Sequence, residues 1–311
     1  MTDVALCVLT AQRPEGLRRM LESIADLRLP ERVEQLVVVV IDNDVSRASP
    51  AQPVCDAVAA ARGLTIECIV ELQRGIPFAR NAALDATVER FDVVGFVDDD
   101  EQLRPDWLER MLGCLDEHDA DAVTGPIRGV FSSTPPTWAV AGGYFDSPTR
   151  PATGTRVPQA YTGNVLMRAA ALRASGLRFD ARFALSGGSD THFFLRFAAQ
   201  GHAIVWCDEA EASEWIPASR VTHGWLLRRS FRIGTSTSLC ERYLAPGPRT
   251  VGVRLAKACV RIVQGVALLP VNALLPGRRP FDALRLVYLG AGMLNGLTGR
   301  HYQEYEHLHT D

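Results

Sequence analysis

Residues 93–101 read Val93-Val94-Gly95-Phe96-Val97-Asp98-Asp99-Asp100-Glu101. An apolar, β-branched run here ends abruptly in four acidic side chains. Such a run is typical of a strand buried on both faces, and its carboxyl end is where α/β sheets bind ligands. Adjacent carboxylates repel one another unless a cation lies among them, and oxygen ligands of this kind suit Mg²⁺ or Mn²⁺ carrying a substrate phosphate. The alternative is a solvated acidic loop, so the flanking sequence has to distinguish the two.

Strand-like and helix-like segments alternate on both sides of this run. The expected strands are residues 4–10, 36–41 and 64–70. Two of the expected helices begin at Pro14 and Pro105, and a third spans residues 78–90. The strand at 36–41 is almost wholly valine, which indicates burial on both faces. This alternation predicts a mainly parallel sheet with helices on both sides, which favours a ligand site over a solvated loop.

Residues 126–160 change in character, because Pro, Gly, Ser and Thr dominate them. We expect a loop-rich insertion of the kind that carries binding function, with Trp138 either a stacking platform for a ligand or a core residue. Strand 161–166 and a helix from Ala169 follow. Gly187-Gly188-Ser189-Asp190 then leads into a helix over residues 191–200, and Asp190 is expected at its N-cap.

Composition sets the broad class of the 311-residue chain. It is 47% apolar and 22% charged, as in an ordinary globular protein. The seven cysteines are scattered and never form CxxC, which favours reduced thiols in a cytosolic compartment over a disulfide framework or a zinc site. The N-terminus leads directly into a strand, so no signal peptide is expected.

Charge is distributed unevenly along the chain. The formal net charge is −3, yet residues 220–300 carry thirteen basic residues against two acidic ones. Ala245-Pro246-Gly247-Pro248 indicates a boundary, after which two apolar runs are too short to span a bilayer. We expect basic amphipathic helices at a membrane interface, with ordinary core-packing helices as the alternative. Nucleic acid is not an expected partner, because no motif of a nucleic-acid-binding fold is present.

Six short motifs, in order, resemble those of the glycosyltransferase family 2 enzymes over roughly residues 3–240. They are Thr10-Ala11-Gln12-Arg13-Pro14, Val39-Val40-Ile41-Asp42-Asn43, Gly75-Ile76-Pro77-Phe78-Ala79-Arg80-Asn81, Phe96-Val97-Asp98-Asp99-Asp100, Thr162-Gly163-Asn164 and Gly187-Gly188-Ser189-Asp190. Residues 214–217 and 225–232, together with Arg220, resemble more narrowly the succinoglycan-type exopolysaccharide glucosyltransferases. Six matches in the right order are far more specific than any one of them.

The resemblance implies the GT-A fold, a Rossmann-like α/β architecture for nucleotide-diphosphosugar transferases with a mainly parallel sheet flanked by helices. It implies a transferase domain over residues 1–244, divided into a nucleotide-sugar-binding half (1–125) and an acceptor and catalytic half (126–244). Residues 245–311 would then form an amphipathic helical appendage at the membrane interface.

The resemblance also implies a set of donor and metal contacts. The candidate metal ligands are Asp98, Asp100 and His223, and the candidate donor-binding residues are Thr10, Arg13, Asp42, Arg80, Asp98, Asp99, Arg229 and Arg232. A divalent ion bridging the phosphates would neutralise charge on the leaving diphosphate, and arginine forks suit phosphate oxygens. Simpler alternatives stay open: Arg80 as a surface helix residue, His223 as structural, and the arginines as a membrane-facing patch.

Asp190 is the candidate catalytic base, which would take the proton from the acceptor hydroxyl. The implied acceptor contacts are Trp138, Asn164, Gly188 and Ser189. Ser189 departs from the family, in which a glutamate usually occupies this position. The implied reaction is inverting transfer from a UDP-sugar to a lipid-linked or free glycan, catalysed at the cytoplasmic face of a membrane.

Two other functions compete with this interpretation. A phosphohydrolase of the haloacid dehalogenase type also has a D-x-D motif after a strand, but on its first strand, whereas this motif follows the fourth expected strand. A catalytically degenerate membrane scaffold is the second, and Ser189 is the feature in its favour. The presence of Asp190 speaks against a scaffold, since a binding module needs no base.

Overall fold

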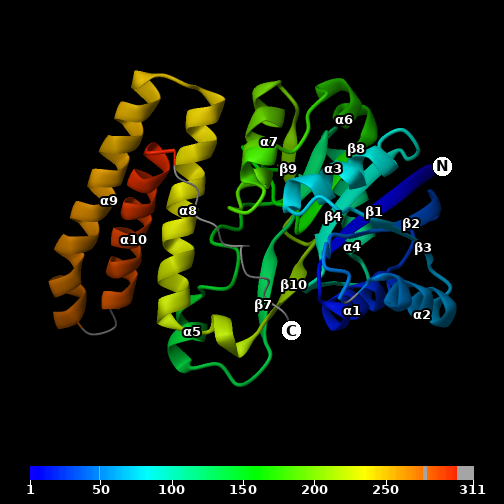
Figure 1. Ribbon diagram of the computed structural model, residues 1–311, viewed down its shortest axis with the longest axis horizontal. Helices are drawn as coiled ribbons and strands as arrows, with labels where there is room; N and C mark the ends of the chain where they lie inside the picture. Colours follow the sequence, from blue (N-terminus) through cyan, green and yellow to red (C-terminus); the bar gives the residue numbers. More distant parts are fainter. Residues whose placement is uncertain (49, 276–278, 300–311) are drawn as a thin grey trace.

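The computed structural model describes residues 1–48, 50–275 and 279–299, so the end of the predicted appendage lies outside the described residues. A seven-stranded sheet forms the centre of the protein (Figure 1), in the order β3-β2-β1-β4-β8-β6-β9. Its strands are β1 (Thr2–Thr10), β2 (Val33–Asp42), β3 (Thr65–Val70), β4 (Val93–Asp98), β6 (Ala122–Thr124), β8 (Asn164–Arg168) and β9 (Ile204–Trp206). Only β8 runs antiparallel to its neighbours. The prediction of a mainly parallel α/β sheet is confirmed.

Helices cover both faces of this sheet, as the all-apolar strands require. On one face, alternate side chains of β1 and β2 pack against α1 (Pro14–Ala25), α2 (Gln52–Arg62) and α4 (Trp107–Glu117). On the other face they pack against α3 (Ile76–Thr87), α6 (Ala169–Ser175) and α7 (Ser189–Ala199). The sequence analysis did not predict α2.

A small second sheet lies beside the carboxyl edge of the first. It has the order β5-β10-β7 and consists of β5 (Glu101–Leu103), β7 (Ile127–Phe131) and β10 (Ala212–Ile216). The segment 126–160 was predicted as loop-rich, but it contributes β7 and α5 (Thr137–Gly142). Short 3₁₀ turns at Ala181–Phe183 and Ala218–Arg220 complete this half.

Three long helices end the described chain, namely α8 (His223–Leu244), α9 (Pro248–Leu274) and α10 (Pro280–Leu297). They lie side by side, with α10 packed against both others and α9 at the outer edge of the protein, far from the sheet (Figure 1). No helix in the described part of the chain is both long enough and apolar enough to cross a bilayer.

Candidate active site

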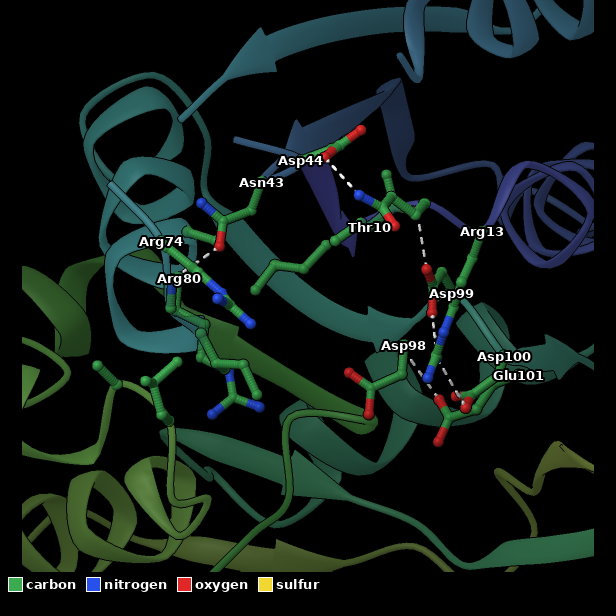
Figure 2. Close-up of a pocket in the computed structure, with 18 of the residues that line it drawn as sticks. Thr10, Arg13, Asn43, Asp44, Arg74, Arg80, Asp98, Asp99, Asp100 and Glu101 are labelled. Carbon is green, nitrogen blue, oxygen red and sulfur yellow. Dashed lines mark hydrogen bonds and ion pairs between the residues drawn. The ribbon is translucent and has the colours of Figure 1, made fainter. Parts of the chain in front are cut away.

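A cavity of about 690 Å³ opens where β1 and β4 end, at the carboxyl edge of the sheet. Strand order reverses at this point, since β2 and β3 lie on one side of β1 while β4 lies on the other. Crevices at such a reversal are where open α/β sheets bind ligands. The acidic run predicted to face a ligand therefore lies in the cavity wall (Figure 2).

The Asp98 carboxylate lines the cavity and makes no hydrogen bond or ion pair with any described residue. Burial raises its pKa to about 6, against the opposing attraction of Arg80. The neighbouring Asp99 is buried, and burial raises its pKa to about 7 despite the charge of Arg13. Asp98 thus lies in the cavity wall without a direct ion pair among the described residues, whereas Arg13 pairs with Asp99, so Asp98 is the candidate ligand for a cation.

Thr10 and Arg13 hold the acidic run in place. Thr10 Oγ1 donates a hydrogen bond to Asp99 Oδ2 at 2.7 Å, and both side chains are buried. Arg13 Nη1 lies 3.0 Å from Asp99 Oδ1 and 3.1 Å from Asp100 Oδ2, so its guanidinium bridges two carboxylates (Figure 2). Both residues line the cavity; Thr10 positions Asp99, and Arg13 also positions Asp100, which was predicted to bind metal.

Asp42 differs from its predicted position. The residue is 1% exposed and does not line the cavity; its carboxylate accepts from the backbone N–H groups of Asp44 and Ala51 and pairs with Arg47. It therefore shapes the loop after β2. Asp44 lines the cavity instead, where its Oδ1 accepts from Gln12 Nε2 at 2.9 Å. Sequence reasoning missed this pair, although the Asp-Asn-Asp run at 42–44 made Asp44 an equal candidate.

Arg80 is only 7% exposed, which excludes the alternative of a surface arginine. Its Nη1 donates to Ser189 Oγ at 2.6 Å, and its Nη2 donates to Thr162 Oγ1. Its Nε is buried without a hydrogen-bond partner. The guanidinium is therefore fixed by two neutral hydroxyl groups, and its charge acts on Asp98.

Asp190 lies in the first turn of α7, and Gly188, with φ +91°, is the N-cap residue, so the predicted cap position was wrong by two residues. Asp190 Oδ1 accepts from the backbone N–H of Thr191 at 2.7 Å. Asp190 is absent from the cavity wall itself, yet its charge contributes to the raised pKa of Asp98 and of Tyr161. The fold therefore brings the candidate base near the acidic run, across 92 residues of sequence.

A second layer of charge surrounds the acidic run and was not assigned from the sequence. Glu101 and Glu214 face each other in the β5–β10 pairing, and burial raises the pKa of Glu214 to about 7 and that of Glu101 well above its usual value. Arg220 lies 2.9 Å from Glu214 and 3.4 Å from Asp100. Glu101 could have been assigned to the site from the sequence, because it continues the acidic run 98–101. Glu214 could not, because it reaches the site only through the pairing of β10 with β5.

Arg229 and Arg232 project from α8 and line the cavity, as a phosphate-binding role requires. Arg229 also lies over the Trp225 ring, with its guanidinium carbon 5.4 Å from the centroid. Arg228, by contrast, is exposed and lies outside the cavity wall.

Asn164 and Gly188 do not reach the cavity. Asn164 is fully buried, and its amide bonds Trp107 Nε1 and the carbonyl groups of Pro126 and Ala210. This network occupies the side chain, so its expected contact with the acceptor is replaced by a structural role.

Trp138 and His223 also lie outside the cavity wall. Their rings stack with centroids 4.0 Å apart, and the His223 ring also contacts Phe281 of α10 at 4.5 Å. The structure thus places the imidazole among aromatic rings. The metal role predicted for His223 has no support in this geometry, and core packing accounts for Trp138.

Comparison with known proteins gives the family. A model described as glycosyl transferase family 2 matches residues 5–176, more than half of the chain. The chain belongs to glycosyltransferase family 2. Its sequence is also 34% identical over 306 residues to the succinoglycan biosynthesis protein ExoM of Rhizobium meliloti (strain 1021), covering 96% of this chain and 93% of that protein.

Solved structures agree on the GT-A fold of this family 2 glycosyltransferase. Mannosyltransferase PcManGT from Pyrobaculum calidifontis, in complex with GDP-Man and Mn²⁺, is similar at 19% identity and a TM-score of 0.63, covering 96% of this chain and 88% of that one. Residues 1–349 of S. aureus TarS in complex with UDP are similar at 17% identity and a TM-score of 0.54, covering 96% and 93%. Family membership excludes the haloacid dehalogenase alternative.

The residues present fit a divalent cation. Asp98 offers carboxylate oxygens that have no hydrogen-bond or ion-pair partner in the described part of the chain, and oxygen donors suit Mg²⁺ and Mn²⁺. Within the described residues, no three His, Cys, Asp or Glu side chains converge into a complete metal cage. One or two carboxylates, completed by substrate phosphates and water, are the usual way of holding Mg²⁺. Asp98 and Asp100 would hold the ion.

Proposed function

We propose that the protein transfers a sugar from a UDP-sugar to a glycan acceptor with inversion at the anomeric carbon. The carrying observation is that Asp98, Arg229 and Arg232 line one cavity at the carboxyl edge of the sheet, with Asp190 near enough for its charge to act on Asp98. A transferase of this kind needs a site for a diphosphate and one base near it; the cavity would supply the first and Asp190 the second.

The donor would lie in the cavity with its diphosphate between the acidic run and α8. Arg229 and Arg232 would bind phosphate oxygens, because guanidinium forks match them in geometry and charge. Asp44 and Gln12, at the ends of β2 and β1, would face the nucleoside. Mg²⁺ or Mn²⁺, when bound, would neutralise the charge developing on the leaving diphosphate.

Asp190 would take the proton from the acceptor hydroxyl as that oxygen forms its bond to the anomeric carbon. The bond from that carbon to the β-phosphate oxygen breaks, and UDP leaves with the electron pair. A single displacement needs one base and gives the opposite anomeric configuration. Because Ser189 is uncharged, it does not neutralise Arg80, and the charge of Arg80 would act on Asp98 and the sugar.

The acceptor would be a lipid-linked glycan in exopolysaccharide biosynthesis, at the cytoplasmic face of a membrane. The similarity to a succinoglycan biosynthesis protein, together with the basic C-terminal helices, supports this. We retain a division at residue 244, with the transferase domain before it and the membrane-facing helices after it.

Purified protein incubated with UDP-sugars and Mn²⁺ tests the proposal, with UDP release and donor hydrolysis as readouts. Asp190→Asn should abolish transfer while UDP binding, measured by calorimetry, is kept. Glu117→Gln is the matched control, because Glu117 is exposed at the end of α4. Its transfer rate should equal that of the unaltered protein.

Three outcomes would contradict the proposal. If no sugar nucleotide binds or turns over, the degenerate scaffold becomes the better interpretation. Loss of UDP binding in Asp190→Asn would remove Asp190 from the base role. An α-linked product from an α-linked donor, identified by the anomeric proton coupling in NMR, would exclude inversion.

A further inference from the structure

The C-terminal helices α8, α9 and α10 are packed through their smallest residues. A Cβ atom on Gly234 of α8 would overlap the Leu289 carbonyl of α10, and one on Gly292 would overlap the Phe231 carbonyl of α8. On α9, a Cβ at Gly265 would lie 2.6 Å from the Ala283 carbonyl. The helix backbones therefore approach closely at these glycines, and Val287 of α10 and Ile262 of α9 pack into the space that Gly265 and Gly290 leave open.

The buried positions of α9 confirm this pattern. They are Arg254, Ala258, Gly265 and Asn272, none of which is a large apolar residue. Arg254 is neutralised there by an ion pair with Glu241 of α8. The interface that α9 makes with its neighbours thus buries almost no large apolar side chain, although such burial is what stabilises helical bundles in water.

Most of the large apolar side chains of α9 point outward instead, whereas Ile262, Leu268 and Leu269 are half-buried. Val260 is 62% exposed, Val263 67% and Leu274 81%, and α9 forms the outer edge of the protein (Figure 1). The other exposed apolar residues of this helix are Val251, Val253, Leu255, Val266 and Val271. Small residues inside and large apolar residues outside is the arrangement of helices packed in lipid, where close backbone contact replaces the hydrophobic effect.

The charges of α9 identify the kind of apolar surface. The helix has no acidic residue, and Arg249, Lys257 and Arg261 are exposed on it. At ~100° per residue, Lys257 and Arg261 fall on one flank between the buried seam and the outward apolar face. From a flank, long basic side chains extend along apolar surface and keep their charged ends at the level of lipid headgroups.

We propose that the outer face of α9 lies in the plane of an anionic bilayer surface, with its valines and leucines at the acyl boundary and Lys257 and Arg261 on headgroup phosphates. A second copy of the chain fits less well, because α9 offers no carboxylate to pair with these cations. No residue of α9 lines the active-site cavity, so the surface is separate from the transfer chemistry.

Flotation of the full-length protein with vesicles tests this, using phosphatidylcholine alone or mixed with phosphatidylglycerol. We expect flotation with the mixed vesicles. Val260→Glu combined with Val263→Glu should abolish it, and Lys257→Gln combined with Arg261→Gln should weaken it about thirty-fold. Leu29→Glu is the control, because Leu29 is 53% exposed on the loop between α1 and β2 and should leave flotation unchanged.

The substituted side chains are exposed, so circular dichroism and UDP binding should match those of the unaltered protein. Turnover of a short water-soluble acceptor should also be unchanged, which separates loss of the membrane surface from loss of the proposed transfer activity. Two results would overturn the proposal. One is flotation that the two glutamates do not change. The other is an unaltered protein that does not float with vesicles but forms a dimer in light scattering, which the two glutamates dissociate.

Discussion

Asn164 was predicted to contact the acceptor, but the structure shows it in a buried hydrogen-bond network. The two roles predict different effects of replacing this residue. Its side chain is fully buried and makes three hydrogen bonds. Oδ1 accepts from Trp107 Nε1 at 2.8 Å, while Nδ2 donates to the carbonyl groups of Pro126 at 3.0 Å and Ala210 at 2.8 Å. The amide thereby joins α4 to the segments that enter the second sheet and leave β9.

Replacing Asn164 by alanine leaves one donor, Trp107 Nε1, and one acceptor, the Ala210 carbonyl, buried without this partner, while the Pro126 carbonyl keeps the backbone N–H of Ala212. Each such group costs ~1–3 kcal/mol, and a water molecule admitted to the small void recovers part of that cost. We expect the free energy of unfolding to fall by ~2–5 kcal/mol, a large part of the ~5–15 kcal/mol typical of a domain. Asn164→Asp should be at least as harmful, because it presents oxygen to both carbonyl groups.

Urea unfolding followed by tryptophan fluorescence measures this loss, and Gln52→Ala, on exposed α2, should change stability by less than ~0.5 kcal/mol. In Asn164→Ala that remains folded at low temperature, the KM for the acceptor should be unchanged. A stability change under ~1 kcal/mol together with a raised acceptor KM would refute the structural role and restore Asn164 to the acceptor site.

Three further predictions follow from single contacts. Thr10→Val removes a 2.7 Å hydrogen bond to Asp99 and should cost ~1.5–3 kcal/mol in urea unfolding at pH 8 but less at pH 6, because the pKa of Asp99, about 7, leaves it ionised only at the higher pH. Burial lowers the pKa of His192 to about 4 from 6.5, so stability should be full above pH 6.5 and fall towards pH 4 by up to ~3 kcal/mol; thermal unfolding of His192→Phe should lack this fall. Gly292→Ala should separate α8 from α10 and lower the melting temperature, whereas Gly252→Ala, on open α9 surface, should raise stability by ~0.5–1 kcal/mol; equal effects would refute backbone contact.

The sequence predicted the sheet well because its strands carry a strong, unambiguous signal. The valine run before Asp42 is stable only where both faces of the sheet are covered. The β-branched segments also alternate with expected helices along the chain. The second sheet was missed because its strands are short and half-exposed. Glu214 and Trp215 in β10, for example, show no apolar alternation that distinguishes them from a loop.

The candidate site was predicted in its location but only in part in its membership. Strand ends of a parallel sheet converge, so polar residues there had to lie together, as Thr10 and Asp98 do. Which of two adjacent polar residues faces the cavity depends on a loop conformation that spacing does not reveal. The Asp42 carboxylate accepts hydrogen bonds from the backbone of its own loop, and Asp44 lines the cavity where Asp42 was predicted.

One helix connects the two surfaces of this protein. The side of α8 that carries Trp225, Arg229 and Arg232 forms part of the cavity wall, while Gly234 of the same helix lies against the backbone of α10. Because that backbone contact is close, α10 and the helix that carries these arginines form one packed unit. A bundle held at a lipid surface would therefore fix one wall of the donor site relative to that surface. An acceptor anchored in the same bilayer would then find the donor site at a fixed distance from the membrane.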